Sequence, residues 1–516
     1  MADAVRAEPH PVASAAAEVP ATAPPSVSPS DLAPTGRRIV TASVMLAMFL
    51  TAMEISIVAT ATPSIVSKLG GFAELTWVFS AFLLAQAATI PIYGRLADLY
   101  GRRPVFAAGT TLFLIGSLLC GLSGSMTQLI LFRVVQGLGA GAIQPVASTI
   151  IGDIYTLEER AKLQGWLSSM WALASLVGPL LGGFIVVYLH WAWIFWVNLP
   201  LGPLAIAGVY LFLREPTTRR QHSVDYLGAG LLASGVSLLL VGLLQGGVGW
   251  AWGSPQSLAM LGGAVVLLVG FVLRQQRAPE PILPLGLFKN RVVAVADGGF
   301  LLVGGVIPSV TTFIPIFVQG VLGLSASVAG LTLVPMSIGW PLASTFAGRV
   351  ILRIGFRRTA QLGAILAVIG SVLLVWAAGQ ATVVWIGLAI LVQGAGFGFM
   401  TTTLIVGLQS SVPWSTRGIA TASAMFSRQL GSTVWVAMLG SVLNAVLISR
   451  AAGGDGPGVT SALLDPVARA ALTPAALVSL ESALAGGVQA VFVGVLVTAV
   501  ALLVVAWLLP SEPAEA

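Results

Sequence analysis

Charged residues are scarce in this chain: Asp, Glu, Lys and Arg make up only 9% of its 516 residues, whereas 57% are hydrophobic. A soluble domain carries about 25% charged residues. The composition therefore excludes an ordinary soluble protein and predicts that most of the chain faces lipid or other apolar helices. The net charge of +6 comes from arginines scattered along short loops. That scatter argues against the clustered basic surface of a nucleic-acid-binding protein.

Cysteine and histidine are also rare. The single cysteine, Cys120, lies inside an apolar run and excludes an intrachain disulfide. The three histidines lie in a tail and two loops, so no His/Cys cluster has the spacing of a metal site. The glycines at 137, 139 and 141 lie in an apolar run with no strand before them, which argues against a nucleotide-binding loop. We therefore expect no metal or cofactor.

Long apolar runs dominate what remains. We count fourteen runs near the 17–25 residues that a membrane-spanning helix needs, rich in glycine and proline, which such helices tolerate. Only three of the 25 Lys and Arg residues, Lys68, Arg450 and Arg469, fall in the alternate loops that face one side. Because positive loops stay in the cytoplasm, we expect both termini to be cytoplasmic. The expected location is the cell membrane.

The runs divide into segments that define the expected architecture. This is an all-α polytopic membrane protein of two six-helix bundles with two additional inserted transmembrane helices. The segments are a disordered cytoplasmic tail (1–38), an N-terminal six-helix bundle (39–213), two inserted spans with cytoplasmic loops (214–290), a C-terminal six-helix bundle (291–510) with an outer loop (450–484), and a cytoplasmic C-terminus (511–516).

An internal repeat supports the two-bundle division. One loop carries Gly94, Asp98, Gly101, Arg102 and Arg103, and a second loop repeats the spacing with Gly348, Gly355 and Arg357. Gln136 and Gln393 begin matching glycine-rich stretches at an offset of 257 residues. Duplicated helical bundles place a binding site at their interface, near the middle of the membrane. The loops are candidate gates, and the alternative is that they only set the membrane orientation.

Several motifs in order resemble the major facilitator superfamily, specifically its fourteen-span drug:proton antiporters. The first loop fits the G-x-x-x-D-x-x-G-R-R/K signature, and Arg133-Val-Val-Gln136-Gly137 fits R-x-x-Q-G. Gly178, Pro179, Gly182 and Gly183 fit the antiporter signature G-P-x-x-G-G. The resemblance implies the major facilitator fold and proton-coupled export. Two positions depart from the pattern: Glu54 stands where Asp is frequent, and Leu352 stands where the first loop has Asp98.

Four charges lie within the apolar runs, where charge is costly and usually functional. They are Glu54, Arg133, Asp297 and Arg428. Helical rise places Glu54 and Arg133 at compatible depths, whereas Asp297 and Arg428 match less well. We predict that these four couple transport to protons. The alternative for each pair is a static structural salt bridge.

Polar, aromatic and Met side chains within the runs are candidates for a substrate cavity. They are Gln86, Gln136, Trp166, Trp171, Gln393, Met425 and Gln429. The sequence thus predicts a proton-driven antiporter that exports amphiphilic or lipophilic small molecules by alternating access, acting as a monomer, with no nucleic-acid partner. Alternatives are an exporter of a lipid or metabolite and a proton-coupled importer. A membrane-embedded enzyme or a receptor is disfavoured, because neither a paired-carboxylate site near an interface nor a large soluble domain is visible.

Overall fold

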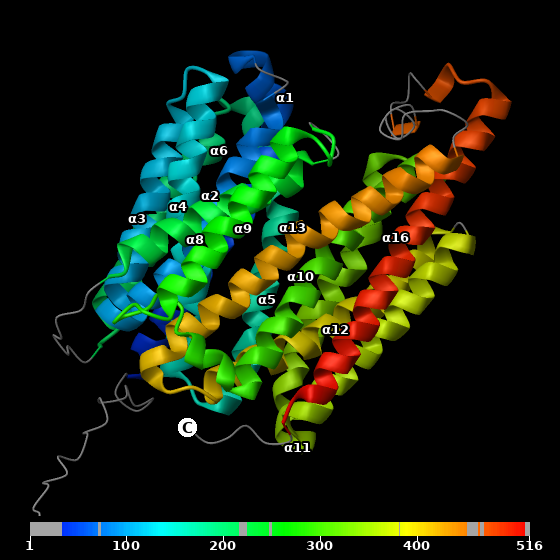
Figure 1. Ribbon diagram of the computed structural model, residues 1–516. Coiled ribbons are helices and arrows are strands. Elements are labelled where there is room, and N and C mark those ends of the chain that lie inside the picture. Colours follow the sequence, from blue (N-terminus) through cyan, green and yellow to red (C-terminus); the bar gives the residue numbers. More distant parts are fainter. Residues whose placement is uncertain are drawn as a thin grey trace, which may run out of the picture.

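The computed structural model describes residues 33–70, 74–215, 224–246, 250–380, 382–450, 463–464 and 469–510. The described chain is helical almost throughout (Figure 1). A helix satisfies its own backbone hydrogen bonds, which is the condition for crossing hydrocarbon. Thirteen of the helices in these ranges are long and apolar enough to span a membrane. The all-helical, polytopic fold predicted from the sequence is confirmed.

The first bundle contains the helices that precede residue 213. They are α1 (Pro34–Leu69), α2 (Leu75–Tyr100), α3 (Arg102–Gly121), α4 (Met126–Ile154), α5 (Leu157–Tyr188), the short α6 (Trp193–Trp196) and α7 (Asn198–Phe212). α1 begins at Pro34, a favoured first helical residue, and so starts before the boundary expected at residue 38. The remainder of the expected tail, residues 1–32, lies outside the described residues.

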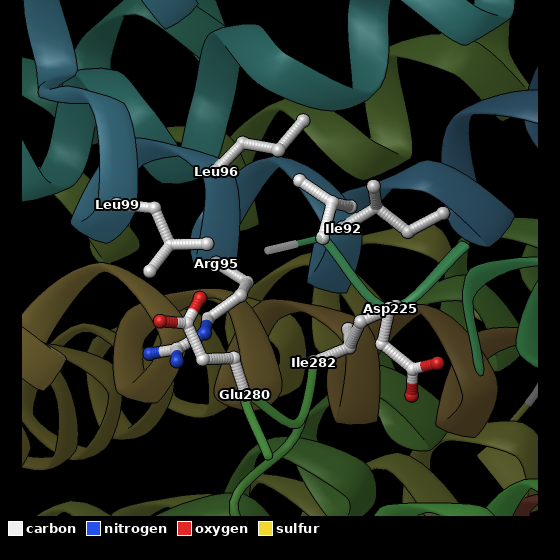
Figure 2. A pocket seen from close by; sticks show the side chains of 8 residues that line it. Ile92, Arg95, Leu96, Leu99, Asp225, Glu280 and Ile282 are labelled. Carbon is white, nitrogen blue, oxygen red and sulfur yellow. The ribbon is translucent and has the colours of Figure 1, made fainter. Parts of the chain in front are cut away.

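Two helices, α8 (Tyr226–Gln245) and α9 (Pro255–Gln275), occupy the segment expected to hold the inserted pair. The lower part of α8 packs through Leu232 and Val236 into an apolar cluster shared with α2 and α13. The chain segments before α8 and after α9 meet the end of α2 at a small pocket, where Arg95 and Glu280 point toward one another (Figure 2). The inserted pair is therefore held against α2 through the first part of α8 and the segments that flank the pair.

The second bundle follows residue 284. It comprises η2 (Leu285–Lys289), α10 (Arg291–Ile316), the π-helical turn η3 (Phe317–Val321), α11 (Ala326–Gln380), α12 (Val383–Ser410), η4 (Trp414–Thr416), α13 (Arg417–Arg450) and α16 (Pro474–Leu508). α16 begins ten residues before the expected end of the outer loop at 484. Residues 511–516, the expected C-terminal tail, are not among those described.

α11 contains a sharp change of direction. Its 55 residues would extend about 80 Å as one helix, far more than the roughly 30 Å hydrocarbon core. Gly355 interrupts it with φ of 80°, and Gly101, between α2 and α3, has φ of 95°. Only glycine adopts such angles without strain. The two repeated loops thus share a left-handed glycine, and the segments 326–354 and 356–380 correspond to two of the fourteen expected spans. The number of spans that cross a membrane remains a prediction.

The two bundles approach each other at the end that carries the α2–α3 turn and separate toward the opposite end (Figure 1). Contacts between them run through α2 and α13 and through α5 and α11. The observed conformation is therefore closed at the α2–α3 end.

Candidate functional site

The centre of the first bundle holds a buried ionic site. Glu54 of α1 and Arg133 of α4 form an ion pair of 2.8 Å, and neither residue is exposed to solvent. Asn198 of α7 donates to the other Glu54 oxygen at 2.8 Å. Buried charges persist only when paired and hydrogen-bonded, and this carboxylate is bonded through both oxygens.

Arg133 is held by further contacts from α2 and from its own helix, α4. Its Nε donates to the Val78 carbonyl of α2 at 3.0 Å, and one terminal nitrogen donates to Gln136 at 2.7 Å. Its guanidinium lies 4.1 Å from the centre of the Phe82 ring. Gln136 in turn donates to Ser117 of α3 at 2.8 Å. We call Glu54, Arg133, Gln136, Ser117 and Asn198 the buried polar cluster; it connects α1, α3, α4 and α7.

The sequence identified Glu54, Arg133 and Gln136 as candidate site residues, but it did not identify Ser117 or Asn198. Both are single polar residues in apolar runs, and that signal alone does not separate a cluster member from an ordinary helix contact. The site is sealed inside one bundle in this conformation, because Glu54 is fully buried. It does not face the interface between the bundles, where the repeat predicted the binding site.

The antiporter motif packs α5 against α1 next to this cluster. A side chain on Gly178 would collide with Ser56, two residues after Glu54, and one on Gly182 would press on Ile57. The Ser56 hydroxyl donates to the Ala174 carbonyl of α5 at 3.0 Å. Gly183 has open space, and Pro179 lies inside the helix. Two of the three glycines therefore permit close approach of the helix that carries Glu54.

The first repeated loop forms the centre of an ionic network between the bundles. The two oxygens of Asp98 accept from the backbone N–H groups of Gly418 and Ile419 at 2.9 and 2.8 Å. These are the first turn of α13, where unpaired N–H groups favour a negative charge. Arg102 donates to Asp98 at 2.9 Å. Asp98 thus binds a helix end of the other bundle while Arg102 holds it in place.

Arg102 also reaches across the interface itself. It donates to the Trp414 carbonyl at 2.7 Å, lies 3.9 Å from the centre of that indole ring, and forms an ion pair with Asp153 at 2.9 Å. Asp153 also forms an ion pair of 2.7 Å with Arg417 of the second bundle. We call Asp98, Arg102, Asp153 and Arg417, with the start of α13, the interbundle network. Sequence reasoning missed the role of Asp153 and Arg417, because each resembles an ordinary charge at a helix end.

The connection after α7 supports the same loop. Glu215 accepts from the backbone N–H groups of Arg102 and Arg103 at 2.7 and 3.1 Å. Burial raises the pKa of this carboxyl above 4.5, against the lowering effect of those two hydrogen bonds. Arg103 lies over the Tyr210 ring at 3.8 Å. Glu215 therefore caps α3 and fixes the turn at Gly101.

The second repeated loop makes contacts of a different kind. Leu352, at the position equivalent to Asp98, is 52% exposed. Arg357 lies 5.6 Å from the centre of the Trp507 ring, and Arg349 lies 5.7 Å from that of Phe346. Gly348, the first residue of the second repeated loop pattern, lies within α11. The two loops share a backbone turn but not a carboxylate.

The second pair of intramembrane charges is not brought together. Asp297 of α10 is buried and accepts from Ser423 of α13 at 3.2 Å. Arg428 instead donates to Gln144 of α4 at 3.0 Å and lies 5.8 Å from the Trp171 ring of α5. Arg428 thus links the bundles rather than pairing with Asp297. Helical depth alone does not specify which face of a helix a residue occupies.

The candidate cavity residues separate into distinct places. Gln136 belongs to the buried polar cluster, and Gln393 donates to Ser371 at 2.8 Å inside the second bundle. Gln86 and Met425 are buried, whereas Trp166 on α5 is 62% exposed. Gln429 lines a cavity of about 790 Å³. The expected residues therefore do not form a single cavity in this conformation.

Comparisons with known proteins agree with this architecture. Residues 44–436 match the model of the Major Facilitator Superfamily. The chain is 37% identical over 411 residues to the multidrug transporter protein MdtP of Bacillus subtilis, covering 79% of this chain and 76% of that protein. It is 35% identical over 436 residues to multidrug resistance protein 3 of the same organism, covering 83% of this chain and 85% of that protein.

More distant proteins share the family or the fold. The efflux pump dotC of Dothistroma septosporum is 33% identical over 419 residues, covering 78% of this chain and 71% of the pump. The human organic anion transporter MFSD10 superposes with a TM-score of 0.59 at 16% identity, covering 90% of this chain and all of that structure. The proton:xylose symporter XylE superposes with a TM-score of 0.57 at 15% identity, covering 90% of this chain and 95% of that structure. The chain belongs to the major facilitator superfamily, and it is a multi-pass membrane transporter rather than an enzyme.

Proposed function

We propose that the protein is a proton-coupled antiporter that exports amphiphilic or lipophilic small molecules across the cell membrane, with both termini in the cytoplasm and the monomer as the working unit. Relatives at 33–37% identity are named a multidrug transporter, a multidrug resistance protein and an efflux pump, which supports the direction and the substrate class. The loop charges support the orientation. The observation that carries the proton coupling is the buried Glu54–Arg133 pair.

Protonation of Glu54 changes the energy of the buried polar cluster. A neutral Glu54 leaves the Arg133 charge uncompensated, and breaking a buried ion pair in this way costs about 3–5 kcal/mol. A conformation that hydrates Arg133 or gives it another partner then becomes favoured. Because α1 packs on the antiporter glycines of α5, and α5 packs on α11 of the other bundle, a shift of α1 reaches the interface between the bundles. Proton binding would thereby favour one access state.

The interbundle network would provide the second element of alternating access. Its contacts join the bundles at the α2–α3 end, which we infer from the loop charges to be the cytoplasmic end. Closing that end while the opposite end is open corresponds to the outward-facing state. A proton crossing about 150 mV gains about 3.5 kcal/mol, which supports a substrate gradient of roughly 300-fold. We expect no other energy source and no cofactor.

The test is dye accumulation in everted membrane vesicles with an acid interior, using Hoechst 33342. We expect wild-type vesicles to accumulate the dye and to stop when the proton gradient is dissipated. Glu54→Gln keeps the shape of the side chain but does not ionise, so it should bind dye and lose the accumulation. Glu54→Asp, the matched control, keeps a carboxylate and should retain part of the activity. Equal accumulation by wild type and Glu54→Gln, at matched amounts of folded protein, would remove Glu54 from the mechanism.

A further inference from the structure

We propose that the groove between α2, the inserted helix α8 and α13 is a binding site for the transported molecule, and that it selects lipophilic compounds that carry at most one charge and bear an N–H or O–H donor. The inference rests on the proposed function and adds a site and a chemical selectivity to it. The groove is the cavity of about 790 Å³ noted above, which is large enough for a drug-sized molecule.

The inserted pair contributes one wall of this site. Leu240, Leu243 and Leu244 from the end of α8 line the groove, together with Trp252 from the connection to α9. The Trp252 ring packs on Gly246, where an added side chain would collide with it. The pair has no counterpart in the repeat of two six-helix bundles. Its helix α8 nevertheless forms a wall of the groove beside α13, so the pair contributes to a cavity as well as to the surface of the transporter.

The shape of the groove follows from how α8 packs. Lower on α8, Leu232 and Val236 form an apolar cluster with α2 and with Phe426 and Leu430 of α13, which closes the space between the helices. Leu240 lies in that cluster and also lines the groove. Above it the helices no longer fill the gap. The groove therefore begins where this cluster ends, on the side away from the interbundle network.

The opposite wall is one face of α13. Groove residues recur on it from Gln429 to Ile448, a spacing that follows the helical period over about 28 Å. This wall carries the polar side chains Gln429, Ser432, Thr433, Ser441 and Asn444. On the facing helix α2 the groove is lined by Leu83, Leu84 and one polar residue, Ser80. The groove is thus amphipathic across its width, with the polar stripe of α13 opposite a largely apolar wall.

Two observations specify the ligand chemistry. None of the described residues that line the groove carries a charge, so a multiply charged molecule would lose hydration without a compensating partner. The Asn444 side-chain oxygen is buried and accepts no hydrogen bond. An unmet acceptor of this kind costs about 1–3 kcal/mol. Because Asn444 lines the groove, a donor on a bound ligand would satisfy this oxygen after a rotation of the side chain. The favoured occupant is therefore a lipophilic molecule with at most one charge and a donor at one edge.

The experiment measures binding of Hoechst 33342, a lipophilic dye with N–H donors, to the full-length protein in lipid nanodiscs. Leu243→Trp fills the groove from the inserted helix, and we expect the Kd to rise at least tenfold. Asn444→Leu keeps the volume and removes the acceptor, so the Kd should rise several-fold. Val266→Trp on α9 is the matched control: its side chain is 70% exposed, it does not line the groove, and its Kd should equal that of the wild type.

The outcomes separate this inference from the proposed function. An unchanged Kd in Leu243→Trp that elutes as a single folded species overturns the groove as a substrate site. Native mass spectrometry that finds a phospholipid lost from Leu243→Trp, with dye binding unchanged, also overturns it and assigns the groove to a membrane lipid. Groove-dependent dye binding without proton-driven accumulation would uphold the site while refuting the proposed antiport.

Discussion

Asp98→Asn should release the α2–α3 end of the protein. In the closed conformation the two Asp98 oxygens accept two backbone N–H groups of α13 and one Arg102 nitrogen. Asparagine keeps one oxygen and turns an NH₂ group toward a donor, so at least one N–H loses its acceptor. Hydrogen bonds to a charged group contribute about 1.5–3 kcal/mol each.

The expected shift follows from these bonds. Arg102 retains Asp153 as a partner in the variant, so the net loss is about 2–3 kcal/mol rather than the full cost of three bonds. Because 1.4 kcal/mol is a factor of ten, the ratio of closed to open molecules should fall about 30- to 150-fold. Transport should fall as well, since alternating access requires both states to be populated.

The assay is the distance between spin labels on Lys162→Cys of α5 and Ile354→Cys of α11, which belong to different bundles near this end. Both native side chains are substantially exposed, and the single native cysteine, Cys120, is buried. A longer distance should become populated in Asp98→Asn. Leu352→Ala, at the equivalent exposed position of the second loop, is the control and should match the wild type. Identical distance distributions in Asp98→Asn and wild type would refute the role given to the network.

Two further predictions concern orientation and pH. A cysteine introduced in the 450–484 region should be labelled by an impermeant maleimide from outside intact cells, and one at 214–225 should not; the reverse pattern would invert the topology. For Glu215, the folded-state pKa lies above the unfolded value of 4.5, so the stability it contributes is complete below pH 4.5 and is lost as pH rises through the folded pKa. In melting experiments in detergent, Glu215→Gln should therefore lose less stability than wild type across that rise, and parallel curves would contradict this assignment.

The sequence was sufficient for the helices and for one ionic pair. Apolar runs of spanning length have few alternatives to a helix in lipid, and the rise per residue placed Glu54 and Arg133 at compatible depths. Depth fails where the choice of helix face decides the partner. Arg428 could have met Asp297 by depth, yet it contacts Gln144 of the other bundle.

The interbundle network lay beyond sequence reasoning for a different reason. Asp98 was recognisable from its motif, but its partners are backbone groups of residues 320 positions away. Such contacts exist in only one arrangement of the bundles and leave no periodic signal in the chain. Asp153 and Arg417 are likewise meaningful only once the bundles are placed together. The repeat predicted where the bundles divide; it could not predict which side would be closed.

The single helix α13 connects the interbundle network, the contact of Arg428 with α4, and the groove. Its first turn is bound by Asp98, Arg428 lies a third of the way along it, and its far half forms the polar wall of the groove. Its 34 residues extend about 50 Å. If it tilts as a rigid rod about Arg428, its two ends move in opposite directions. Detachment at Asp98 and narrowing of the groove would then be one motion, so occupancy of the groove would itself hold the opposite end shut.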